Sequence, residues 1–156
     1  MSIPQPGMTV GTIRLPDGQG RPVSTWAYRQ HRPLVLVLWD DADPALLAGF
    51  AHAYSAYRAA GAEVLAIGRR APPADAPFPC LHDAEGRVAA ALAHEAPAIL
   101  VLDAYGELFH RWQGDAARTP DHADIQDWVR FTGLQCEECG PHAENWPRRD
   151  PGDAGG

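Results

Sequence analysis

Two cysteines three positions apart, in the stretch Cys136-Glu137-Glu138-Cys139, are the residues of this 156-residue chain best suited to chemistry. Thiols at this spacing can close a small disulfide ring and exchange electrons with other thiols, or supply half of a tetrahedral zinc site. His142 is a candidate third zinc ligand, and the tail offers no evident fourth. Haem attachment is excluded because Gly140 stands where that motif has histidine. A redox-active pair, a metal site and a chemically idle pair all remain open.

A second group of reactive side chains, Asp40, Asp41 and Asp43, directly follows an apolar run at 34–39. Carboxylates of this kind suit magnesium or calcium. More often they neutralise a helix N-terminus, where free N–H groups and a partial positive charge attract them. Pro44 fits the first helical position because it has no N–H to leave unpaired. We therefore expect the Asp43 side chain to cap a helix and expect no metal here.

The third cysteine, Cys80, lies in an apolar extended segment, where a lone cysteine is usually a small buried hydrophobe. We give it no chemical role. The seven histidines lack the His-x-x-x-His and His-x-Glu spacings that place two metal ligands on one helix face. No cofactor is therefore expected, and zinc at the Cys136/Cys139 pair is the alternative.

Buried strands and a long helix must position these groups. The run at 34–39 has the unbroken apolar pattern of a strand covered on both faces, as in parallel sheets. Apolar residues spaced by three and four predict a helix over 43–60, which Gly61 ends. A second buried strand follows at 63–68, and the short connections imply a parallel pair. The fold class is therefore α/β.

The remaining pattern predicts a mixed sheet with further helices. A Pro-Asp-Gly turn at 16–18 between β-prone runs at 9–15 and 23–26 predicts an N-terminal hairpin. A buried strand at 98–102 turns into an antiparallel partner at 107–112, after a short helix at 87–94. Thr119-Pro120 predicts the start of a final helix that Gly133 closes. Trp112 and Trp128 are expected in the core.

Composition limits the partners and the location. The net charge is −7 and all cations are arginines, which argues against nucleic acid or an anionic membrane surface as partner. No apolar run approaches the roughly 20 residues that span a bilayer. The N-terminus lacks the features of a secretory signal, so we expect a cytoplasmic protein with reduced thiols. We expect a flexible lead-in at 1–8, one domain at 9–140 and a disordered tail at 141–156.

Three local motifs, in this order, resemble the thioredoxin-like superfamily in its peroxiredoxin-like form, the AhpC/TSA or redoxin family. The resemblance covers roughly 7–140. The motifs are the opening LPDG at 15–18, FPCLHDAEGRVA at 78–89 and APAILVLDAYGE at 96–107. The resemblance implies a central mixed sheet flanked by helices, and a cis proline facing the redox centre, for which Pro97 is the candidate.

In that family the reactive cysteine lies at the start of the long helix, and Asp43 occupies this position here. Ala98 stands where peroxiredoxins have an arginine near the peroxide. Peroxidase activity at the family site is therefore not expected. Our first hypothesis is a redoxin-type thiol–disulfide oxidoreductase or antioxidant-family protein acting through Cys136 and Cys139 on a partner protein. The alternatives are a thioredoxin-fold binding module without catalysis, and a structural zinc site at the cysteine pair.

Overall fold

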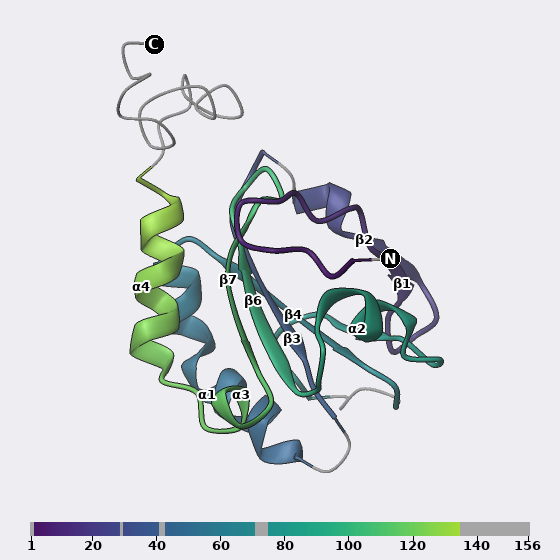
Figure 1. The fold of residues 1–156 in the computed structure, drawn as a ribbon. Coiled ribbons are helices and arrows are strands. Elements are labelled where there is room, and N and C mark those ends of the chain that lie inside the picture. Colours follow the sequence, from purple (N-terminus) through teal and green to yellow (C-terminus); the bar gives the residue numbers. More distant parts are fainter. Residues whose placement is uncertain (1, 29, 41–42, 71–74, 135–156) are drawn as a thin grey trace.

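A five-stranded mixed sheet in the order β5-β4-β3-β6-β7 forms the centre of the protein (Figure 1). The structure is a computed structural model that describes residues 2–28, 30–40, 43–70 and 75–134. β3 runs parallel to β4 and β4 to β5, whereas β6 is antiparallel to both of its neighbours. The α/β class and the mixed sheet expected from the sequence are confirmed. The strands are β3 (Leu34–Leu38), β4 (Glu63–Gly68), β5 (Cys80–His82), β6 (Ala98–Leu102) and β7 (Leu108–Gln113).

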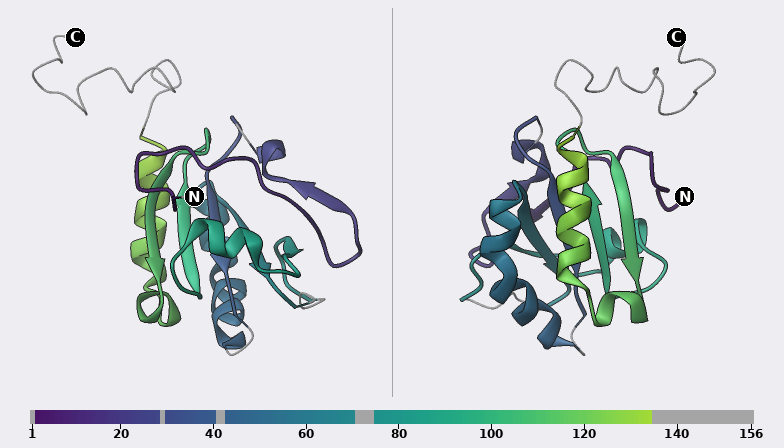
Figure 2. Two further views of the ribbon diagram at one scale, coloured as in Figure 1. Left: turned by 45° about the vertical axis from the view of Figure 1, so that its right-hand side comes forward. Right: turned by 90° about the vertical axis from the view of Figure 1, so that its left-hand side faces the viewer.

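Both faces of the sheet are covered, which explains the unbroken apolar strands. Val35 and Val37 of β3 point to a core shared with α1 (Pro44–Ala59) and α4 (His122–Thr132). Leu36 and Leu38 point to a second core formed with α2 (Arg87–Leu92) and the N-terminal segment. The right-hand view of Figure 2 shows α1 and α4 side by side on their face. Successive strand residues therefore pack into opposite cores.

The N-terminal hairpin is confirmed, with strands β1 (Arg14–Pro16) and β2 (Pro22–Ser24) paired antiparallel. A 3₁₀ turn, η1 (Thr25–Tyr28), follows it. An isolated bridge between Asp17 and Leu81 connects the hairpin to β5, which is an edge strand of the sheet. The paired strands are shorter than the β-prone runs that predicted them.

Three Asp-x-x-G turns, which begin at Asp17, Asp83 and Asp103, share one geometry. In each, the glycine N–H donates to the aspartate carbonyl oxygen, at 3.0, 2.9 and 3.1 Å respectively. Each glycine has a positive φ, 81°, 70° and 89°, which side chains other than glycine rarely adopt. Each aspartate carboxylate also accepts N–H groups of the residues that follow. The family-like motifs at 78–89 and 96–107 are thus turn-forming signals.

Asp83 uses its carboxylate to hold the start of a helix. Its carboxylate accepts the backbone N–H groups of Arg87, Val88 and Ala89 at 3.1, 3.0 and 3.2 Å. These are orphan donors of the first turn of α2. Gly86 is the residue directly before that helix and makes no side-chain cap, so Asp83 caps α2 from a distance while itself 4% exposed.

The start of the last helix differs from the prediction. α4 is capped by Asp121, whose carboxylate accepts the N–H of Asp124 at 3.2 Å, and Thr119-Pro120 does not start it. An extra short helix, α3 (Asp115–Arg118), occupies the preceding residues, and Thr119 ends it. The prediction was wrong because Thr119 and Pro120 lie in the connection between α3 and α4, and Asp121 takes the capping position. Trp112 and Trp128 pack against the core but are only partly buried.

The N-terminal segment runs beside β7. The Gly7 N–H donates to the Leu108 carbonyl at 2.8 Å, and the Leu108 N–H donates to the Met8 carbonyl at 2.9 Å. The Arg111 guanidinium donates to the Pro4 carbonyl at 2.6 Å.

Among the described residues, no helix has the length and apolar character needed to cross a bilayer. The domain limits expected from the sequence stay a prediction.

Candidate functional site

Three segments meet where β3 ends, at the position that the sequence resemblance identifies as the redox site. They are the turn at Asp40 and Asp43 before α1, the loop before β6 and the short helix α3 (Figure 1). The Ala96–Pro97 peptide bond in that loop is cis, as the resemblance implies, and Pro97 is buried. The cis bond that the resemblance implies is therefore present.

The side chain of Asp43 does not cap α1, which corrects the expectation from the sequence. Asp43 is the residue before the helix, but its carboxylate makes no capping hydrogen bond. The N–H of Leu46, one of the donors that a capping side chain would take, donates instead to the Asp43 backbone carbonyl at 3.2 Å. Its φ of −136° and ψ of 70° also lie outside the usual capping conformation. Pro44 does occupy the first turn as predicted.

An arginine reaches this site from an element that sequence reasoning missed. Arg118 of α3 places Nη1 3.7 Å from the Asp40 carboxylate, and its Nη2 donates to the Ala96 carbonyl at 3.5 Å. Its Nε lies 3.7 Å from Asp115. Arg118 therefore links the end of β3 to the loop before the cis proline. At these distances and with 41% exposure, the pairing contributes little to stability.

Arg118 was overlooked because the family pattern has its arginine at the position that is the first residue of β6 here. That position is Ala98, which is fully buried inside the sheet, where a guanidinium would have no room. The only signal in the sequence was an arginine just before Thr119-Pro120, within a helix that the prediction did not include. Chemically, the described part of the site offers a carboxylate beside a guanidinium and no thiol. It can bind polar groups, but it has no group that cycles between dithiol and disulfide.

Cys80 is buried, as the sequence predicts. It lies on β5 with 7% exposure, and its Sγ is 3.6 Å from the Phe78 carbonyl. Burial raises the pKa of the Cys80 thiol to about 11. A thiol that stays protonated at neutral pH is a poor nucleophile.

Cys136, Cys139 and His142 lie outside the described residues. The helix that precedes them, α4, begins beside α3 and runs about 16 Å toward the other end of the sheet (Figure 1). Its last residues, Thr132 to Leu134, therefore lie far from Asp40 and Pro97. Within the described ranges no group of three His, Cys, Asp or Glu residues is arranged to hold a metal ion.

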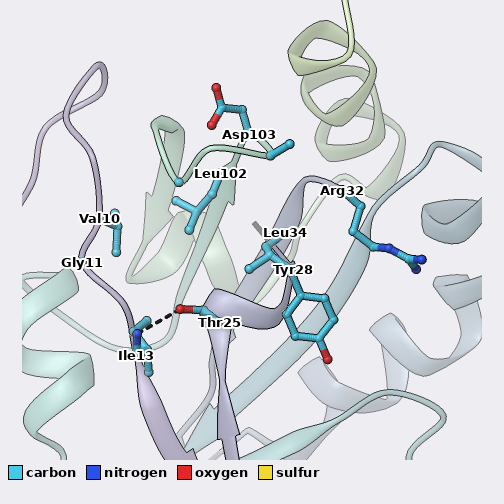
Figure 3. Close-up of a pocket in the computed structure, with 11 residues that line it drawn as sticks. Val10, Gly11, Ile13, Thr25, Tyr28, Arg32, Leu34, Leu102 and Asp103 are labelled. Carbon is cyan, nitrogen blue, oxygen red and sulfur yellow. Dashed lines mark hydrogen bonds between the residues drawn. The ribbon is translucent and has the colours of Figure 1, made fainter. Parts of the chain in front are cut away.

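A small pocket lies at the start of β3, at the end of that strand away from Asp40 (Figure 3). Its volume of about 20 Å³ holds no more than a single water molecule. The Ile13 N–H donates to Thr25 Oγ1 at 2.9 Å in its wall, and Leu34 and Leu102 supply apolar surface (Figure 3). The cavity is too small for a substrate.

A buried tyrosine and a partly buried histidine join α1 to the start of α4. The Tyr57 hydroxyl lies 2.7 Å from His122 Nδ1, and the His122 ring packs edge-on against Phe50 at 4.7 Å. Burial raises the pKa of Tyr57, so the hydroxyl keeps its proton at neutral pH. Burial also lowers the pKa of His122, against the opposing effect of Asp121. The imidazole is therefore neutral at pH 7.

We expect acidification to destabilise the protein in part through His122. Because its folded pKa lies below the unfolded value of about 6.5, the unfolded state binds the proton first. The stabilisation is complete above pH 6.5 and is lost as pH falls through the folded pKa. Urea unfolding of His122→Gln and of the native chain between pH 7.5 and 5 measures this. The stability lost between these pH values should be smaller in the variant, and equal losses would contradict the assignment.

Comparison with known proteins bears on the fold. The sequence matches no protein-family model and no curated protein. Solved structures do match: the peroxidoxin BcpB of Mycobacterium tuberculosis, with a TM-score of 0.65 and 19% identity over 81% of this chain and 96% of that one. A structure from Neisseria meningitidis, solved as a candidate thioredoxin, matches with a TM-score of 0.67 and 18% identity over 85% of this chain and 94% of that one. AhpC of Enterococcus faecalis matches with a TM-score of 0.69 and 13% identity over 83% of this chain and 92% of that one. The chain has the thioredoxin-like fold in its peroxiredoxin-like form.

Proposed function

We propose that the protein is a redoxin-type thiol–disulfide oxidoreductase whose reactive thiols are Cys136 and Cys139. The proposal is carried by the observation that neither the start of α1 nor the third cysteine offers a reactive thiol. The start of α1, where the fold family has its reactive cysteine, holds Asp43. Cys80 is buried with its pKa raised to about 11. The pair thus supplies the two remaining thiols of a chain with three cysteines.

The proposed reaction moves two electrons from the pair to a disulfide. The thiolate of one cysteine attacks a sulfur of the substrate, and the other substrate sulfur leaves with the bonding electrons as a thiolate. The second cysteine then attacks the mixed disulfide, closes the Cys136–Cys139 bond and releases the second substrate thiolate. In the cytoplasm expected from the sequence, the pair begins each cycle reduced.

The surroundings favour exchange with a partner protein over attack on peroxide. The pair follows the carboxyl end of α4, which carries a partial negative charge, and Glu137 and Glu138 lie between the thiols. Both features disfavour the thiolate. We therefore propose a protein disulfide as substrate and slow reaction with hydroperoxides.

A binding module without redox catalysis is the second candidate. It is favoured by the contacts of Arg118 with Asp40 and Ala96, which join the end of β3 to the loop before the cis proline. In that case the Asp40 and Arg118 side chains would contact a partner through polar bonds, and the cysteine pair would be idle.

Mixing the reduced protein with excess glutathione disulfide distinguishes the two candidates. A redox-active pair releases two glutathione molecules per chain and ends as an intramolecular disulfide. The Cys80→Ser variant serves as control and should release the same amount, because the buried thiol takes no part. If glutathione release stays far below one per chain, the redox proposal fails and the binding module is preferred.

A further inference from the structure

One stripe of α4 combines exposed aromatic and acidic side chains. Asp124, Asp127, Trp128 and Phe131 follow the spacing of three, four and seven residues that places side chains on one helix face. They line a shallow hollow of about 240 Å³, which we call the α4 groove. Phe131 is 52% exposed, which is unusual for a phenylalanine on the surface of a small domain.

The floor of the α4 groove continues onto the edge strand β7. The ring of Trp128 stacks on His110 with centroids 4.6 Å apart, and Phe131 packs edge-on against Phe109 at 5.8 Å. His110 in turn contacts Trp112 at 4.3 Å. Ring contacts between the two elements position the aromatic side chains of the groove.

We propose that the groove is the docking site for the C-terminal segment of the same chain, Trp146-Pro147-Arg148-Arg149. Trp146 is the only Phe, Tyr or Trp residue after Leu134, and Arg148 and Arg149 are the only Lys or Arg residues there. The segment therefore offers one aromatic ring flanked by cations, and the groove offers aromatic rings flanked by two carboxylates. The Trp146 ring packs on Trp128 and Phe131.

The acidic side of the groove has capacity for the two arginines. Asp127 already pairs with Arg130 at 3.0 Å through Oδ1, and its side chain is 75% exposed. Its second carboxylate oxygen can accept a guanidinium, and Asp124 lies one turn earlier on the same stripe. A guanidinium and a carboxylate pair well through two parallel hydrogen bonds. The charge pattern thus selects the orientation in which the arginines follow Trp146 toward the start of α4.

The connecting chain has the right length for this contact. Eleven residues, 135–145, separate Leu134 from Trp146. A flexible chain of that length has an end-to-end distance of about 20 Å. On the helix, Asp124 and Leu134 are about 15 Å apart along the axis. A linker whose average reach matches the span gives the highest effective concentration of the attached segment. The docking is independent of the redox chemistry proposed for Cys136 and Cys139.

Nuclear Overhauser contacts in the full-length, reduced protein test the proposal. We expect contacts between the Trp146 ring and the rings of Trp128 and Phe131, unchanged when the protein is diluted tenfold. Trp146→Ala should shift the signals of the α4 groove. The matched control is Trp26→Ala, an exposed tryptophan in η1, which should leave those signals in place.

A charge exchange gives a second, independent readout. Asp124→Arg alone should weaken the Trp146 contacts, and combining it with Arg148→Asp and Arg149→Asp should restore them. Absence of Trp146 contacts in the native chain overturns the proposal. In a mixture of isotope-labelled and unlabelled chains, contacts between the two kinds of chain would also overturn it, because they would identify a second copy as the occupant. Groove signals that do not change in Trp146→Ala would overturn it as well.

Discussion

Replacing Asp83 with alanine is expected to lower the free energy of unfolding by about 3 kcal/mol. The change removes a carboxylate that accepts three backbone N–H groups of the first turn of α2. Because Asp83 is only 4% exposed, water reaches the vacated donors poorly. For a domain of this size, the loss corresponds to a fall of about 10 °C in Tm. Urea and thermal unfolding followed by circular dichroism measure both quantities.

Glu85→Ala is the matched control for Asp83→Ala. Glu85 is an acid of the same turn, but its side chain is 67% exposed and pairs with the exposed Arg87. Its removal should change the free energy of unfolding by no more than about 0.5 kcal/mol. If the two variants lose equal stability, charge in the turn rather than capping by Asp83 holds α2 in place.

Replacing either Cys136 or Cys139 with serine is expected to halve the glutathione released from glutathione disulfide, from two molecules per chain to one. The remaining thiol can still attack the disulfide, but no second thiol is present to resolve the mixed disulfide. The variant should therefore accumulate with one glutathione attached, which intact-protein mass spectrometry detects. If both serine variants still release two molecules per chain, a third thiol takes part and the proposed site is wrong.

The sheet and most helices could be predicted because their signals are local. β3, β4 and β6 are almost entirely apolar, since each packs into cores on both faces, and a short run of this kind between turn residues is typical of a buried strand. The turns at Asp83 and Asp103 were also visible, as aspartate followed three residues later by glycine. The role of Asp83 was not visible in the sequence. Asp83 caps a helix that begins four residues later, whereas the usual capping rule considers only the residue directly before the helix.

The site itself was only partly predictable. The cis bond before Pro97 followed from the family-like motif, and the place of Asp43 before α1 followed from the proline after it. The bonding at that place did not, because the Asp43 backbone carbonyl competes with its own side chain for the Leu46 N–H. Arg118 reaches Asp40 across 78 positions of sequence through a helix too short to leave a periodic pattern. Contacts of this kind depend on the packed fold.

Counting free thiols in the unfolded protein and bound zinc in the folded protein, before and after mild oxidation, tests the central claim most directly. The claim is that the redox thiols of this thioredoxin-like chain are Cys136 and Cys139, with Cys80 inert. Alkylation should then detect three thiols in the reduced protein, one in the oxidised protein, and no zinc in either. Three thiols after oxidation, or one zinc ion per chain held by the reduced protein, would contradict it.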